Sequence, residues 1–138
     1  MSEQRLVWTG EGLQFEGATG YGEPVRIGGE PPGAKPSDLL PLSLAACTAY
    51  DVVVILRKQR QVLRRMDVRI TTRQDSEPPW TFRAIHSHFV LTGAIDDRKA
   101  ARAIELAESK HCSVAATLRG VVEISHSHEI VTDDDGAV

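Results

Sequence analysis

The chain has 138 residues and a formal net charge of -3 at pH 7; 41% of its residues are hydrophobic and 5% are aromatic. Length and composition predict a single domain over residues 1–138, with a core built mainly from Val, Ile, Leu and Ala. They argue against a nucleic-acid partner, which requires a clustered basic face, and we expect neither a secretory leader nor a membrane-spanning segment.

Three short strands are expected in the N-terminal part. Residues 5–9 and 13–16 would pair as a hairpin across the glycine turn at 10–12, and residues 23–27 give a third candidate. Residues 28–36 hold several glycines and prolines, which are incompatible with a helix, so this stretch predicts an exposed loop.

A long helix is expected from Asp38 to about residue 61, with Asp38 as its N-cap and Pro41 in the first turn, where proline costs no intrahelical hydrogen bond. Apolar residues fill most of its circumference, which is typical of a buried helix. A chain of this size has little material to surround such a helix, so we expect a second subunit to cover it. The basic run from Arg57 to Arg65 suits a solvated C-terminal end, where cations complement the helix dipole.

Five further elements are expected in the C-terminal half: strands at 66–73 and 81–92, a second helix ending near Lys110, a short helix at 113–118 and a last strand at 121–131. Asp96 or Asp97 is the expected N-cap of the second helix. The acidic tail, residues 132–138, is expected to be disordered. Strands, long helix, strands, helix and strand in this order predict an α+β fold.

The two cysteines decide the functional interpretation. Cys47 lies within the long helix and Cys112 follows the second helix. We expect the protein in the reducing cytoplasm, where thiols are kept reduced, and therefore expect no permanent disulfide. Free cysteines are among the most buried residue types, so both could be packing residues, or they could form a redox pair. Their spacing matches neither a thioredoxin-like motif nor a zinc knuckle and leaves both hypotheses open.

The segment at 36–53, PSDLLPLSLAACTAYDVV, resembles the cysteine-bearing helix of the OsmC/Ohr family. The segment KHCSV at 110–114 is similar to the family's second cysteine segment, and the glycine-rich loop at 28–33 resembles the approach to the helix. The likeness extends over residues 5–131. It implies the OsmC-like fold, in which antiparallel sheets wrap a long central helix in an intertwined homodimer.

The resemblance also implies a peroxidase cycle without a cofactor. Cys47 would reduce a hydroperoxide and become a sulfenic acid, and Cys112 would condense with it to a disulfide. Arg26 is the candidate cation beside Cys47, with Arg5 as a weaker substitute. Asp38, standing where close relatives carry glutamate, would orient that arginine or would only cap the helix. An external dithiol, often a protein-bound lipoyl group in this family, would restore both thiols.

The substrate is expected to be an organic hydroperoxide, because the neighbours of Cys47 in the sequence are apolar: Leu40, Leu44, Ala46 and Tyr50. A second hypothesis is an OsmC-like protein that binds a small ligand or a partner without turnover, with largely structural cysteines. The discriminating property is the reactivity of the two thiols toward a hydroperoxide.

Histidines suggest a third hypothesis, a zinc-binding domain. His86 and His88 alternate along one strand, as do His126 and His128, and His111 adjoins Cys112. The pattern on the last strand is better explained by partly buried sheet residues, and the short ligand spacings of a zinc site are absent. We therefore expect no metal.

Overall fold

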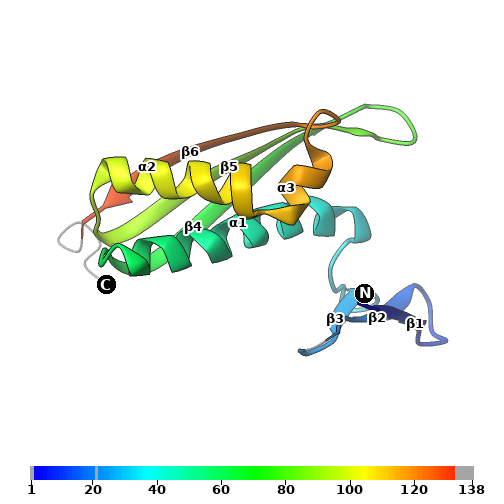
Figure 1. The fold of residues 1–138 in the computed structure, drawn as a ribbon. Coiled ribbons are helices and arrows are strands. Elements are labelled where there is room, and N and C mark those ends of the chain that lie inside the picture. Colours follow the sequence, from blue (N-terminus) through cyan, green and yellow to red (C-terminus); the bar gives the residue numbers. More distant parts are fainter. Residues whose placement is uncertain (1, 21, 133–138) are drawn as a thin grey trace. The chain divides into compact units, whose positions relative to one another are not determined.

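The computed structural model describes residues 2–20 and 22–132, and the chain divides into two units, Met1–Leu40 and Pro41–Val138 (Figure 1). We refer to them as the first and the second unit. The acidic residues from 133 onward, which we expect to be disordered, lie outside the described residues. The assignment of residues 1–138 to one domain stays a prediction.

The first unit is an antiparallel sheet in the order β1 (Arg5–Trp8), β2 (Gln14–Ala18) and β3 (Val25–Gly28). The three predicted strands are confirmed, with boundaries shifted by one or two residues. Gly28 ends β3 with a positive φ of 64°, and a Cβ there would lie 2.2 Å from the carbonyl oxygen of Leu13. Only glycine fits this close approach of two backbones.

The long helix begins differently from the prediction. A 3-10 turn, η1 (Pro36–Asp38), leads directly into α1 (Leu39–Lys58). Lys35 is the N-cap of η1, and its side chain makes no cap hydrogen bond. Asp38 lies inside the helical segment that η1 begins, so the prediction that Asp38 is the N-cap of this segment was wrong. The reason is Pro36, because proline suits the first helical position and forces the residue before it into an extended conformation.

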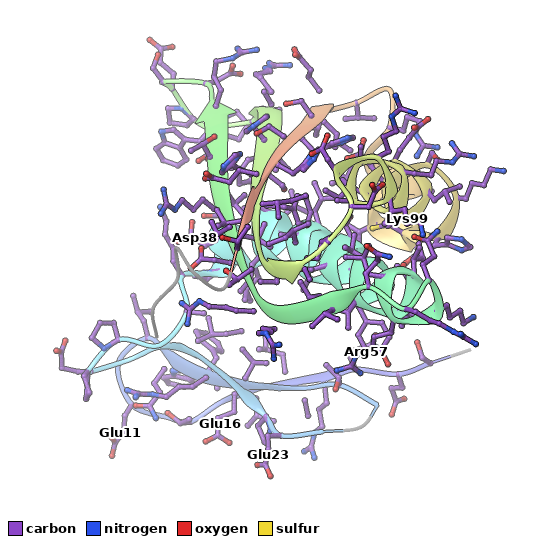
Figure 2. The ribbon with its side chains drawn as sticks, turned by 90° about the vertical axis from the view of Figure 1, so that its left-hand side faces the viewer. Glu11, Glu16, Glu23, Asp38, Arg57 and Lys99 are labelled. Atoms are coloured by element: carbon purple, nitrogen blue, oxygen red, sulfur yellow. The ribbon has the colours of Figure 1, made fainter. Side chains whose placement is uncertain are left out.

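The C-terminal end of α1 agrees with the prediction. Arg57 and Lys58 occupy the last turn and both are exposed; Figure 2 labels Arg57 at this end of the helix. Cations at this end interact favourably with the negative end of the helix dipole.

The second unit contains a sheet in the order β4 (Val62–Gln74), β5 (Phe82–Ala94) and β6 (Glu123–Val131). β4 and β5, the strands expected at 66–73 and 81–92, pair as an antiparallel hairpin, whereas β5 and β6 run parallel. The expectation of purely antiparallel sheets was therefore wrong for this one. Between β5 and β6 the chain returns through helices on one face of the sheet, and such a crossover makes the two strands parallel (Figure 1).

Three helical segments form this crossover: α2 (Asp97–Leu106), the π-helical turn η2 (Ala107–His111) and α3 (Ser113–Leu118). Asp96 is the N-cap of α2, as predicted, and accepts a hydrogen bond of 3.0 Å from the backbone N–H of Lys99. Alternate residues of β5 are buried on the face that the helices cover, among them Ile85, Phe89 and Leu91.

Two clusters of side chains form the core of the second unit. In the larger, Val52 and Leu56 of α1 pack with β5 and with small residues of α2. In the smaller, Leu44 packs with Ile85 and Cys112. In both clusters the helices thus pack against the sheet, and the smaller cluster contains Cys112 with Cys47 packed against it.

One face of α1 is buried and the other is exposed. Leu44, Val52 and Leu56 are buried, but Leu42 is 52% and Tyr50 is 74% exposed, so a single chain covers only part of the helix and its cover by a second subunit stays a prediction. By length and composition alone, Pro36–Lys58 could also cross a membrane, contrary to our expectation. Its buried face belongs to the core of the second unit, which is the property of a core helix, so we infer no membrane span.

Candidate functional site

Cys47 and Cys112 meet in the smaller core cluster of the second unit. Cys47 lies in the first half of α1, and Cys112 is the N-cap residue of α3. Both are free thiols, and the two side chains are hydrogen-bonded to each other. Of the four predicted site residues, these two are brought together by the structure.

Local structure explains the position of Cys112. η2 closes with a hydrogen bond of 2.8 Å from the backbone N–H of Cys112 to the carbonyl oxygen of Ala107. Cys112 then becomes extended, and its sulfur accepts a hydrogen bond of 3.3 Å from the N–H of Ala115. The side chain is only 2% exposed, whereas Cys47 is partly exposed. A small reagent therefore reaches Cys47 more easily.

The surroundings of Cys47 favour its thiolate. Burial by itself raises the pKa of Cys47, but four hydrogen bonds lower it: from the Cys112 thiol, from the backbone N–H groups of Val114 and Ser113, and from the Ser113 hydroxyl. Together they hold the pKa of Cys47 below its ordinary value. Donors directed at a sulfur stabilise the negative charge of the thiolate, the form in which a cysteine is nucleophilic.

The pKa of Cys112 is shifted in the opposite direction, above its ordinary value. Burial raises its pKa most, and its hydrogen bond to Cys47 and the negative charge of that thiolate raise it further. Hydrogen bonds from the N–H of Ala115 and from the hydroxyl of Thr48 lower it, but by less. The pair is therefore asymmetric: the pKa of Cys47 lies below the ordinary value of a cysteine and the pKa of Cys112 lies above it.

Sequence reasoning assigned no role to two residues that contact the sulfurs, Ser113 and Thr48. Each directly follows a cysteine in the sequence, and each hydroxyl is hydrogen-bonded to the cysteine of the other segment. Their only signal in the sequence was this adjacency. Which sulfur a hydroxyl contacts depends on the packing of α1 against α3.

Arg26 and Asp38 belong to the first unit. Arg26 is exposed on β3, and its Nη2 donates a hydrogen bond to the carbonyl oxygen of Pro31 in the following loop. Asp38 is exposed and closes the 3-10 turn, where its N–H bonds the carbonyl oxygen of Lys35 at 3.0 Å (Figure 2). Arg5, the substitute cation, is exposed on β1. Their roles toward Cys47 stay predictions.

The histidines of the last strand pair with carboxylates. Nδ1 of His126 lies 3.0 Å from Glu108 and Nε2 of His128 lies 2.8 Å from Asp97. On the other face of the sheet, His86 and His88 bond serine hydroxyls of β6. Over residues 2–20 and 22–132, no three His, Cys, Asp or Glu side chains converge as metal ligands.

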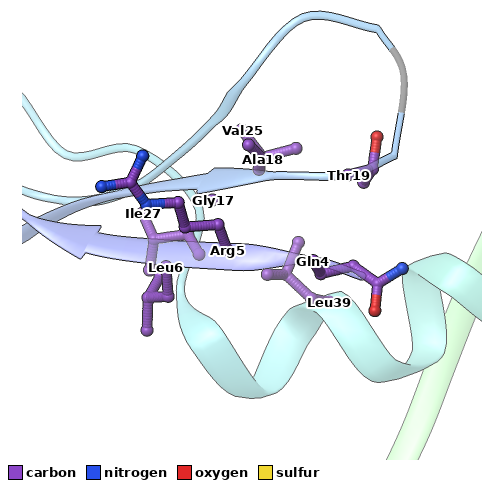
Figure 3. A pocket seen from close by; sticks show the side chains of 9 residues that line it. All are labelled: Gln4, Arg5, Leu6, Gly17, Ala18, Thr19, Val25, Ile27 and Leu39. Atoms are coloured by element: carbon purple, nitrogen blue, oxygen red, sulfur yellow. The ribbon is translucent and has the colours of Figure 1, made fainter. Parts of the chain in front are cut away.

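A separate pocket of about 340 Å³ lies within the first unit. It is almost entirely apolar and opens on one face of the three-stranded sheet, between Leu6, Val25, Ile27 and Leu39 (Figure 3). Neither cysteine lines it. Such a pocket can take an apolar ligand or an apolar side chain of a partner.

The sequence model of the family described as OsmC-like protein matches residues 28–127. Protein YhfA of Escherichia coli K12 is 38% identical over 132 residues, which cover 94% of this chain and 98% of YhfA. A solved structure of a hypothetical protein from Aquifex aeolicus VF5 has a TM-score of 0.86 and 25% identity, covering 96% of this chain and 98% of that chain. An organic hydroperoxide resistance protein OsmC from Legionella pneumophila has a TM-score of 0.66 and 18% identity, covering 94% and 96%. The resemblance seen in the sequence and the α+β, OsmC-like fold are thus confirmed.

Proposed function

This chain belongs to the OsmC-like protein family, and we propose that it is a two-cysteine thiol peroxidase that reduces organic hydroperoxides. The observation that carries the proposal is the hydrogen-bonded pair of Cys47, whose pKa is lowered, and Cys112, whose pKa is raised. A nucleophile that ionises readily beside a protonated second thiol is the arrangement that such a cycle requires. The similar protein from Legionella pneumophila, named for organic hydroperoxide resistance, supports the substrate class.

In the first step the Cys47 thiolate attacks the terminal oxygen of the hydroperoxide. An S–O bond forms, the O–O bond breaks, and the alkoxide leaves and takes a proton from water to become an alcohol. Cys47 is oxidised by two electrons to a sulfenic acid. The N–H groups of Ser113 and Val114 and the Ser113 hydroxyl hold the thiolate before attack.

In the second step the Cys112 sulfur attacks the sulfenic sulfur of Cys47. The S–S bond forms, the S–O bond breaks, and the oxygen leaves as water with the proton of the Cys112 thiol. Because the two side chains are already hydrogen-bonded, this step needs little movement. An external dithiol, for which a protein-bound lipoyl group is our candidate, then reduces the disulfide and becomes a disulfide itself.

Arg26 and Asp38 complete the proposed site. The guanidinium of Arg26 would add a positive charge beside the Cys47 thiolate, and the Asp38 carboxylate would orient it. This part of the proposal rests on the resemblance of the sequence to the OsmC/Ohr family, and Arg5 is the alternative cation. The organic character of the substrate is supported by Leu44, which packs in the cysteine cluster, although Ala46 and Tyr50 are exposed in the single chain.

We further propose a cytoplasmic homodimer. Free thiols suit a reducing compartment. The exposed apolar residues of α1 and the apolar pocket of the first unit give two surfaces that a second copy of the chain would cover.

Peroxide consumption with excess dithiol tests the function, comparing the parent with Cys47→Ser and Cys112→Ser. We expect Cys47→Ser to abolish O–O cleavage, because the thiolate is lost. In the pre-reduced protein without added dithiol, which would itself reduce a sulfenic acid, Cys112→Ser should consume one equivalent of cumene hydroperoxide and accumulate a sulfenic acid at Cys47, measured by dimedone trapping and mass spectrometry. Multiple turnover without Cys47 would exclude the proposed mechanism.

The second candidate function, binding without turnover, is favoured by one observation: the apolar pocket of the first unit is lined by neither cysteine. Thiol titration of the reduced parent protein after addition of hydroperoxide separates the two candidates. Two thiols that survive one equivalent of cumene hydroperoxide in the native parent protein would favour the binding protein, and loss of both thiols would favour the enzyme.

A further inference from the structure

Glu108 is anchored on two sides, and the segment between the anchors contains Cys112. Its Oε2 lies 3.0 Å from Nδ1 of His126 on β6. Its backbone carbonyl accepts a hydrogen bond of 3.0 Å from Nη2 of Arg119, the residue that follows α3. The hydrogen bond from Arg119 to Glu108 therefore closes residues 108–119 into a loop. This loop contains both Cys112 and the donors to Cys47.

The same residue lies in the π-helical turn that precedes Cys112. In η2 the N–H of Cys112 reaches back five residues to Ala107, instead of the four residues of an α-helix. π-Helical turns are rare and occur frequently at functional sites. A return to α-helical register would rotate the following residues by about 100° around the axis, since a helix has 3.6 residues per turn. The register of η2 thus sets the direction of the Cys112 side chain.

We propose that Glu108 is a positioning residue for Cys112: held by His126 and Arg119, it keeps η2 in its π-helical register and so directs the Cys112 sulfur at Cys47. The inference rests on the proposed peroxidase function. The step that depends on this direction is disulfide closure, because there the Cys112 sulfur must reach the sulfenic sulfur of Cys47. Above the titration midpoint of Cys47, the first step requires only the Cys47 thiolate and the peroxide.

The chain offers a matched control. Asp97 also pairs with a histidine of β6, with 2.8 Å between its Oδ1 and Nε2 of His128. It lies at the start of α2 and not in the turn that holds Cys112. Asp97→Ala and Glu108→Ala therefore remove the same kind of contact from the same strand, and only Glu108→Ala releases η2.

The experiment follows the two steps separately in the reduced, full-length protein after one equivalent of cumene hydroperoxide. Loss of the Cys47 thiol measures the first step, and mass spectrometry of the disulfide measures the second. We expect closure about tenfold slower in Glu108→Ala, with a dimedone-trappable sulfenic acid, because small displacements of reacting groups have effects of this order or larger. At a pH above the titration midpoint of Cys47 in every protein compared, the first step should keep the parent rate in both variants, and Asp97→Ala should close at the parent rate.

Two further variants keep the test decisive if Glu108→Ala folds poorly. Glu108→Gln keeps an oxygen acceptor for His126 and should restore most of the closure rate. Arg119→Ala removes the other anchor and should also slow closure. Equal closure rates in Glu108→Ala, Arg119→Ala and Asp97→Ala would overturn the positioning role while leaving the peroxidase intact. A parent protein whose Cys47 is not oxidised would instead overturn the proposed function itself.

Discussion

At the scale of single residues, the two thiols differ because one hydrogen bond connects them. The Cys112 thiol donates toward the Cys47 sulfur, and this contact lowers the pKa of Cys47 while it raises that of Cys112. Burial raises the pKa of both cysteines, so burial alone would leave two thiols that ionise less readily than an ordinary cysteine. At the start of α3, the N–H groups of Ser113 and Val114 and the Ser113 hydroxyl lower the pKa of Cys47 further, whereas the N–H of Ala115 donates to Cys112.

This arrangement predicts the pH dependence of the first step. The thiolate of Cys47 should persist at pH values where an ordinary cysteine is protonated, and the rate should fall only as the pH falls through the lowered pKa. Cys112→Ala removes the donor that lowers the pKa of Cys47 most, so the midpoint should move upward, and Ser113→Ala should move it upward by less because the Ser113 hydroxyl lowers that pKa least. The pH dependence of iodoacetamide alkylation at Cys47 measures each midpoint.

Thr48→Val is the control for this series, because its hydroxyl is hydrogen-bonded to Cys112 and lowers the pKa of that residue. It should affect Cys47 less than Cys112→Ala does. An alkylation midpoint for Cys47 at or above that of an unfolded cysteine peptide would contradict the asymmetry of the pair.

The sequence predicted the two cysteines but not the residues that act on them. Resemblance identified Cys47 and Cys112 because each lies in a recognisable segment. Ser113 and Thr48 contact the sulfurs across two elements, and no local pattern reports such a contact. Asp38 was predicted as the N-cap because aspartate is a good N-cap residue. The prediction was wrong because the helical segment already begins at Pro36.

At the scale of elements, the cap of α2 gives a stability prediction. The Asp96 side chain accepts from the N–H of Lys99, and its own N–H donates to Gln61 at 2.8 Å. Asp96→Ala should lower the free energy of unfolding by about 1 kcal/mol, the typical effect of removing an N-cap. Asp96→Asn retains a cap and should lower it by less; urea denaturation measures both. An unchanged stability in Asp96→Ala would show that α2 is held by its packing alone.

Periodicity and caps predicted the elements well because they are local. The cap of α2 is one of the two predicted residues and the short helix lies at 113–118 as expected, whereas β4 begins four residues before its predicted start. The parallel pairing of β5 with β6 was missed, because strand direction in a sheet depends on residues far apart in the chain. The bulge of β4 between Leu63 and Arg65 was missed for the same reason: it lies opposite Gly93 of β5, where a Cβ would lie 1.9 Å from the carbonyl oxygen of Val62.

At the scale of the whole molecule, the exposed side of α1 remains to be explained. Leu42, Ala46, Tyr50 and Val54 are exposed and follow one another at intervals of four residues, so they form one apolar stripe. Isolated apolar side chains on a surface are common, but a continuous stripe on a helix is typical of an interface. A symmetric dimer would place the same stripe of both copies in contact.

We predict that the protein is a dimer and that a charged residue introduced into this stripe dissociates it. We expect twice the mass of the chain for the parent in analytical ultracentrifugation, and the mass of one chain for Tyr50→Glu, because a buried charge without a partner is costly. Tyr50→Phe keeps the apolar surface and should remain dimeric. The donors to Cys47 come from its own chain, so monomeric Tyr50→Glu should retain the low alkylation midpoint of Cys47. Peroxide turnover lost together with the dimer would then indicate that the second copy completes the substrate site, whereas a monomeric parent at all concentrations would exclude the interface.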